Sequence, residues 1–115
     1  MIKESSTNHF NKTEVLYKCP VTFTLEMIGG RWKPLIIWQL KEGKMRYNEL
    51  RKALPLISEK MLIQHLKELE TDNLLVREAK PVVPPFVEYR LTEKGDEIKP
   101  ILSAMAAWGL RHKTS

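Results

Sequence analysis

Four polar residues within one short stretch have the types and the spacing to bind an anion. Ser58, Lys60, Gln64 and Lys67 lie in the segment LISEKMLIQHLKELETDNLL, Leu56 to Leu75. At roughly 100° per residue of an α-helix, the two lysines and the glutamine point in similar directions. Ser58 is a natural N-cap, and the amides of a first helical turn can hold a phosphate. The stretch therefore predicts a helix with a cationic, hydrogen-bonding face.

The other face of this predicted helix is apolar. Leu62, Leu66 and Leu69 fall within a narrow sector opposite the lysines, which is typical of a helix with one buried side. For the helix taken alone, the simplest alternative is a polar face that only contacts water, as most lysine and glutamine surfaces do. The neighbouring segments decide between the two interpretations.

The segment just before it predicts a second, shorter helix. Tyr47, Leu50 and Leu54 are spaced i, i+3 and i+7 in RYNELRKAL, and Pro55 closes the segment. A short helix, a brief turn and a capped helix are the layout of a helix-turn-helix, whose second helix enters the major groove of DNA. In such a groove lysine can bond guanine or phosphate, and glutamine can pair with adenine.

The segment after the capped helix predicts a β-hairpin. The side chains of Val87, Tyr89 and Leu91 alternate with polar ones, and LLVREAK precedes them across a proline-rich PVVPP tip. This hairpin would form a wing beside the helix-turn-helix. The predicted contacts to backbone phosphates come from the wing and from the entry to the short helix: Arg77, Lys80 and Arg46.

The rest of the chain predicts further helices in a mainly α fold. One begins at Cys19-Pro20 and stops at Gly29-Gly30, and an almost wholly apolar one covers Trp32 to Lys41. Thr92 can cap a last helix, in which Pro100 must cause a kink or begin a second helix. We expect residues 1–18 to form a flexible arm and residues 19–115 to form one winged helix-turn-helix domain.

The last predicted helix carries more apolar surface than one thin domain can cover by itself. The residues expected to contact a partner are Ile101, Leu102, Met105 and Trp108. We therefore expect a homodimer that forms through the terminal helices, with packing inside a single subunit as the alternative.

The composition favours a polyanionic partner and disfavours other classes of protein. Nineteen Lys and Arg against fourteen Asp and Glu give a net charge of +5.

We expect a cytoplasmic protein with no membrane association, because no apolar run approaches the length of a signal peptide or a membrane span. We expect no enzyme activity, because no glycine-rich phosphate loop or nucleophile elbow is present. One cysteine and the scattered His9, His65 and His112 predict no metal and no cofactor.

Three motifs together carry a resemblance to a known family. CPVTFTLEMIGGRWKPLIIWQL, RYNELRKALPLISEKMLIQHLKELETDNL and VPPFVEYRLTEKG resemble the HxlR family of bacterial winged-helix transcription regulators, relatives of the MarR group. The resemblance covers Cys19 to about Trp108. It implies a homodimer that binds a palindromic operator in double-stranded DNA and acts as a repressor or an activator. It implies a recognition helix over Ser58 to Asp72 and a wing over Val76 to Leu91.

One position departs from the family pattern. Members usually carry arginine where this chain has Phe86, at the tip of the wing. An arginine there would contact the minor groove, so Lys80 or the shape of the DNA would have to replace that contact.

The resemblance also implies a role for Cys19, the only thiol. In some members a cysteine at this place senses oxidants or electrophiles through intersubunit disulfides or adducts. Sensing requires a partly exposed thiolate, which a helix N-terminus and the neighbouring Lys18 would favour. The alternative is an inert, half-buried residue. Because the chain has no second cysteine, a disulfide must cross subunits or involve a small thiol.

These observations predict a sequence-specific DNA-binding regulator. The alternative from another class is a winged-helix module that binds an acidic protein partner through the same cationic face.

Overall fold

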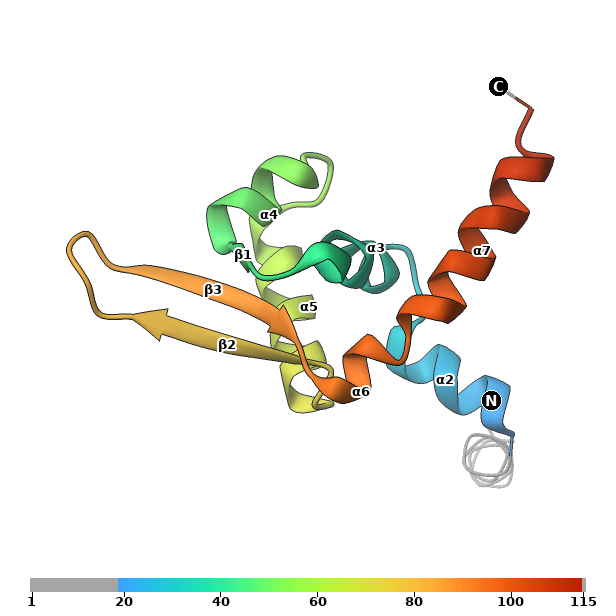
Figure 1. Ribbon diagram of the computed structural model, residues 1–115, viewed down its shortest axis with the longest axis horizontal. Helices are drawn as coiled ribbons and strands as arrows, with labels where there is room; N and C mark the ends of the chain where they lie inside the picture. The colour runs from blue at the N-terminus through green and yellow to red at the C-terminus, as the bar shows by residue number, and fades with distance from the viewer. Residues whose placement is uncertain (1–18, 115) are drawn as a thin grey trace, which may run out of the picture. The chain divides into compact units, whose positions relative to one another are not determined.

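The computed structural model describes residues 19–114, and the chain divides between Gly30 and Arg31 into two compact units. The described part of the first unit is helix α2, Pro20–Ile28, with Pro20 in its first turn and Gly29 as its C-cap (Figure 1). The helix predicted between Cys19-Pro20 and the glycine pair is thus confirmed. The predicted arm and His9 lie outside the described residues.

The second unit is mainly helical and contains a small sheet. Its elements are α3 (Trp32–Gln39), the 3-10 turn η1 (Leu40–Glu42), β1 (Met45–Arg46), α4 (Tyr47–Ala53), α5 (Glu59–Thr71), β2 (Leu75–Lys80), β3 (Phe86–Leu91), α6 (Glu93–Asp96) and α7 (Lys99–His112). Pro100 lies in the first turn of α7, so it begins a second helix and does not kink one. None of the helices among residues 19–114 could cross a membrane, since each is too short or too polar.

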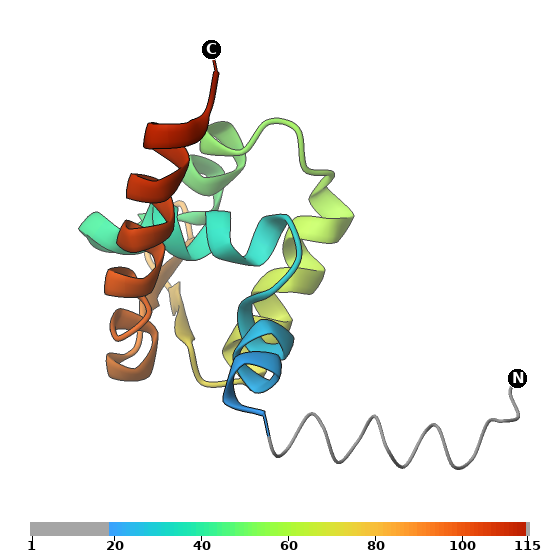
Figure 2. The same cartoon turned by 90° about the vertical axis from the view of Figure 1, so that its right-hand side faces the viewer.

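The core of this unit forms where α3 packs between α5 and α7 (Figure 2). Ile36 and Ile37 of α3 and Leu62 and Leu69 of α5 have no exposed surface. α3 buries side chains on more than one side, as its sequence predicts, although Leu35 stays 39% exposed. This packing fixes the buried face of α5 and so fixes which face it presents outward.

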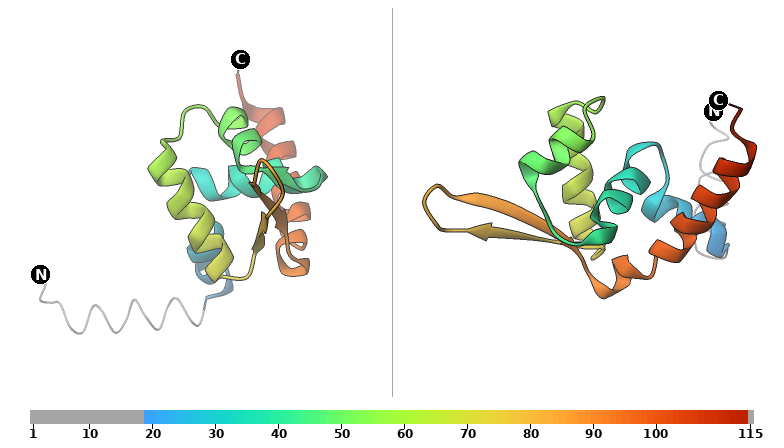
Figure 3. Two further views of the ribbon diagram at one scale, coloured as in Figure 1. Left: turned by 90° about the vertical axis from the view of Figure 1, so that its left-hand side faces the viewer. Right: turned by 45° about the horizontal axis from the view of Figure 1, so that its top comes forward.

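The sheet has three strands, and the sequence predicted only two of them. Its order is β1-β3-β2, with β1 pairing Met45 to Tyr89 and Arg46 to Glu88. The sequence did not predict β1, because two residues are too few to show the alternation that marks a strand. The β2–β3 hairpin itself is confirmed and extends away from helices α3, α4 and α5 (Figures 1 and 3).

A polar junction ties the base of the hairpin to the end of α5. Asn73 takes a left-handed conformation with φ 61°, which asparagine tolerates better than most residues. The Thr92 hydroxyl donates to the Asn73 carbonyl at 2.7 Å and accepts from the Gly95 amide at 3.0 Å. Because Asn73 precedes β2 and Thr92 follows β3, these bonds fix the wing relative to α5.

Candidate nucleic-acid interface

Helix α5 presents the polar face that its sequence predicts. Ser58 is the N-cap, and its hydroxyl accepts from the Met61 amide at 3.1 Å. Lys60, Gln64 and Lys67 are all exposed, while the leucines of the opposite face are buried. The predicted helix boundaries, Ser58 to Asp72, match the N-cap and the C-cap of α5.

An acidic residue that the sequence did not single out lies next to Gln64. The Gln64 amide donates to a Glu68 carboxylate oxygen at 3.2 Å, and Lys33 of α3 contacts the other oxygen at 3.0 Å. Hydrogen bonds from Lys33, then from Gln64 and His65, lower the pKa of Glu68 to about 2. The carboxylate therefore stays charged at neutral pH and restrains the amide of Gln64.

The Lys33–Glu68 pair predicts a pH dependence of stability. A carboxyl group whose pKa is depressed on folding stabilises the folded state above its ordinary pKa of 4.5, and this contribution is lost as the pH falls towards about 2. We expect the thermal midpoint of the wild type to fall more than that of Glu68→Gln in this window. The difference should be small, because the pair is partly exposed and water screens it. Circular dichroism melts would measure it, with Glu70→Gln as the control. If the thermal midpoints of wild type and Glu68→Gln fell in parallel with pH, the Lys33–Glu68 pair would not be the source of this stability.

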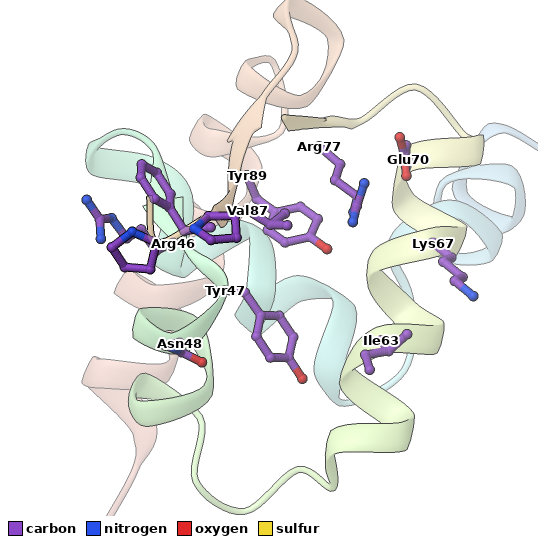
Figure 4. A pocket seen from close by; sticks show the side chains of 12 residues that line it. Arg46, Tyr47, Asn48, Ile63, Lys67, Glu70, Arg77, Val87 and Tyr89 are labelled. Carbon is purple, nitrogen blue, oxygen red and sulfur yellow. The ribbon is translucent and has the colours of Figure 1, made fainter. Parts of the chain in front are cut away.

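A groove of about 820 Å³ runs between α5 and the sheet (Figure 4). Its cationic lining residues are Arg46, Lys67 and Arg77, and its one acidic lining residue is Glu70. The remaining lining residues are Tyr47, Asn48, Ile63, Pro84, Pro85, Phe86, Val87 and Tyr89. Figure 4 shows Ile63 and Glu70 of α5 facing the tyrosines and Arg77 across the groove. The structure thus brings Lys67 and Arg77 to one groove and places Arg46 at its border, with the Arg46 side chain directed away from α5.

Two tyrosines contribute neutral hydroxyl groups to this groove. Burial raises the pKa of Tyr89, although the neighbouring Arg77 opposes that shift. Burial also raises the pKa of Tyr47, whose hydroxyl donates to Glu59 at 3.0 Å. In the sequence both tyrosines belong only to apolar patterns, Tyr47 to a helical one and Tyr89 to an alternating one, and neither pattern shows that a groove lies beside them.

The predicted phosphate-binding cations differ in what they contact. Lys80 lies 3.8 Å from Glu88, whose side chain is only 12% exposed and is also 3.7 Å from Lys44. Among residues 19–114, no carboxylate lies within 4.0 Å of the Arg46 or Arg77 guanidinium. The Arg46 guanidinium instead lies over the Phe86 ring, 3.7 Å from its centroid. Arg46 and Arg77 are therefore available to an anion, whereas Lys80 is held beside a carboxylate.

Helix α7 leaves an apolar face exposed. Ile101, Met105 and Trp108 are 45%, 56% and 61% exposed, and at roughly 100° per residue they fall within one narrow sector of the helix. Leu102 is only 5% exposed, so its prediction as a dimer contact is wrong. It lies roughly 100° from Ile101 around the helix and packs within its own chain.

Cys19 occupies the N-cap position of α2 and is half-buried. Hydrogen bonding from the Thr22 side chain, and then from the Thr22 and Val21 backbone, lowers the pKa of its thiol below the ordinary value of 9.0. Partial exposure and a lowered pKa are the conditions that thiolate chemistry requires.

Comparison with protein-family models gives one match, HxlR-like helix-turn-helix, over residues 27–115. The chain belongs to this family. The match includes α3 to α7 and therefore the cationic face of α5, the groove and the exposed face of α7.

Relatives of this HxlR-like chain include both curated proteins and solved structures. The regulatory protein named MalR of Fusobacterium mortiferum is 52% identical over 94 residues, covering 81% of this chain and 89% of MalR. The oxidised form of the redox regulator HypR is 44% identical with a TM-score of 0.80, covering 84% of this chain and all of HypR. A Porphyromonas gingivalis W83 protein assigned to the MarR family is 42% identical with a TM-score of 0.81, covering 84% of this chain and 94% of that protein.

These comparisons establish the class of the protein. It is a transcription regulator of the helix-turn-helix type with a winged-helix fold. The family resemblance read from the three sequence motifs is thereby confirmed, and the family consists of regulators and not of enzymes. The alternative of a winged-helix module that only binds an acidic protein is correspondingly disfavoured.

Proposed function

We propose that this HxlR-like regulator acts in the cytoplasm as a homodimer that binds a palindromic operator, as a repressor or an activator. The observation that carries the proposal is the groove between α5 and the sheet, which places Arg77 and Lys67 beside the exposed polar face of α5 and has Arg46 at its border. A helix of this kind fits the major groove, and the adjoining sugar–phosphate strand fits a groove lined with cations.

Each residue of the interface has a distinct proposed role. Lys60, Gln64 and Lys67 face the major groove, and Gln64 is presented by its bond to Glu68. Ser58 and the amides of the first turn of α5 bind a phosphate. These contacts combine charge, which carries affinity, with hydrogen bonding to base edges, which carries sequence preference.

The wing and its base supply the remaining backbone contacts. Arg77 binds a phosphate of the strand in the groove, and Arg46 binds a phosphate from the other face of the sheet. Lys80 is a weaker contributor, because its ammonium must divide its charge between a phosphate and Glu88.

Titration with salt tests DNA binding directly. The wild-type chain should bind a labelled mixed-sequence duplex with an affinity that falls steeply as salt rises, because bound cations displace the counterions of the phosphates. Absence of binding, or binding that salt does not change, would contradict the proposal. An acidic polypeptide at the same ionic strength serves as the comparison for a protein-binding role.

The exposed face of α7 supports the homodimer. Pairing of Ile101, Met105 and Trp108 with the same residues of a second subunit would bury a face that is 45% to 61% exposed in the single chain. In such a dimer the two α5 helices are expected roughly 34 Å apart, so that they enter successive major grooves.

A second proposed function is oxidant or electrophile sensing through Cys19. The lowered pKa and partial exposure of the thiol support it, as does the similarity to a protein described as a redox regulator. A peroxide would take two electrons from two Cys19 thiols of a dimer, or from one Cys19 and a small thiol. A disulfide would form, and the two thiol protons and two electrons would reduce hydrogen peroxide to two waters, or an alkyl hydroperoxide to one water and one alcohol.

The sensing role predicts a response that depends on this one thiol. Mild peroxide or a quinone should change the affinity of the wild type for DNA severalfold, and Cys19→Ser should not respond. Binding curves before and after treatment, with non-reducing gels, would measure the effect. Unchanged wild-type affinity after complete thiol modification would rule the sensor out while leaving DNA binding intact.

A further inference from the structure

Phe86 lies directly beneath the side chain of an arginine proposed to bind DNA. The Arg46 guanidinium carbon is 3.7 Å from the centroid of the Phe86 ring. Arg46 pairs with Glu88 across β1 and β3, and Phe86 is two residues from Glu88, so it projects from the same face of β3. Diagonal neighbours in an antiparallel pair lie within reach of long and aromatic side chains. The register of a strand of only two residues therefore creates this contact.

Building on the proposed DNA binding, we propose that Phe86 is a positioning residue. It holds the Arg46 guanidinium in place for a phosphate of the bound duplex, on the face of the sheet opposite to Arg77 and Tyr89. Both residues border the groove between α5 and the sheet, and Figure 4 shows the Arg46 side chain directed away from α5.

The stacked arrangement leaves the arginine free to bind. A guanidinium is planar and carries its five N–H donors in that plane, so a ring that covers one flat side does not block them. Arg46 is exposed, and no carboxylate among the described residues reaches its guanidinium. The donors can thus form a two-pronged contact with phosphate oxygens.

The acids close to Arg46 are occupied elsewhere. Glu88, its partner in the ladder, contacts Lys44 at 3.7 Å and Lys80 at 3.8 Å. Glu49 accepts from the backbone amide of Arg46 at 2.7 Å and so fixes the main chain where α4 begins. Both the backbone and the side chain of Arg46 are therefore held before DNA arrives.

This restraint should increase affinity by reducing an entropic cost. A free arginine loses much rotamer freedom when it binds a phosphate, whereas a stacked arginine has already lost part of it. If Phe86 acts only in this way, its contribution must disappear once Arg46 is absent. If Phe86 instead supports folding of the wing in general, replacing it should still weaken binding when Arg46 is absent.

The test compares binding of full-length variants to a mixed-sequence duplex and to duplexes that the wild type selects from a random pool, at several salt concentrations. Phe86→Ala and Phe86→Leu should weaken binding about threefold to fivefold per subunit, in line with an exposed cation–π contact. Arg46→Ala should weaken it further and reduce the salt slope by about 0.9 per lost phosphate contact. Phe86→Tyr should bind like the wild type, and Phe86→Ala should add nothing to Arg46→Ala.

Three results would overturn the inference. They are wild-type affinity in Phe86→Leu, losses that add in the double variant, and failure of Phe86→Tyr to retain binding. Thermal melts identify any variant that does not fold, and the Leu and Tyr variants keep the bulk of the side chain if the Ala variant unfolds. If the wild type binds neither duplex, the proposed function fails as well. If Lys60→Ala with Lys67→Ala weakens binding but the Phe86 variants do not, only the positioning role fails.

Discussion

Replacing Lys60 and Lys67 together by alanine should reduce affinity for a selected duplex by about a hundredfold or more near physiological salt. Both side chains are exposed on the outer face of α5, so their removal leaves the buried leucines and the fold unchanged. A homodimer would lose four cations. The slope of log affinity against log salt should therefore become shallower by about 3 to 4, at about 0.9 per phosphate contact. Fluorescence anisotropy over a series of salt concentrations measures both quantities.

A matched double variant separates this effect from a general loss of charge. Lys41→Ala with Lys99→Ala removes the same number of charges from η1 and α7, at positions that line a different hollow. We expect this control to retain most of the affinity and of the salt slope. Equal losses in the two double variants would show that net charge binds DNA and that the face of α5 has no special role.

The second large effect concerns the exposed face of α7. Met105→Glu should convert the proposed dimer into monomers at micromolar concentration, because twofold symmetry would place two new charges in one apolar interface. Loss of the dimer should also weaken operator binding by more than about a hundredfold, since two linked half-site contacts become independent. Light scattering after size-exclusion chromatography gives the mass, and anisotropy gives the affinity.

Ser103→Glu is the control for this substitution. Ser103 is exposed and lies roughly 160° from Met105 around α7, so it adds the same charge on the other side of the helix. We expect it to remain dimeric. A wild-type chain that is monomeric at all concentrations, or a Met105→Glu variant that stays dimeric, would remove α7 from the interface.

The helices could be predicted from sequence because their apolar residues recur at helical spacing. Leu62, Leu66 and Leu69 determine which face of α5 is buried, and Ser58 determines where the helix begins. Strand β1 could not be predicted, because a two-residue strand has no periodicity and exists only through its pairing with β3. The hairpin of β2 and β3 was predictable, because both strands are long enough to show alternation.

The candidate site was predictable residue by residue but not as a surface. The type and place of Arg46, Lys67 and Arg77 indicated contact with an anion, yet only the packing of α5 beside the sheet shows that they line one groove. The stack of Arg46 on Phe86 depends on strand register, which no local pattern reveals. Leu102 was misassigned for a related reason, since spacing identifies an apolar side chain but not the surface that covers it.

Selection of bound fragments from a random pool of duplex DNA by the wild-type chain is the sharpest test of DNA recognition by α5. We expect enrichment of an inverted repeat whose half-sites lie about 10 to 10.5 base pairs apart, or a multiple of that spacing. We also expect that the Lys60→Ala, Lys67→Ala variant does not enrich this repeat. Absence of any enriched sequence, or the same repeat selected equally well by that variant, would contradict the assignment of α5 as the recognition helix.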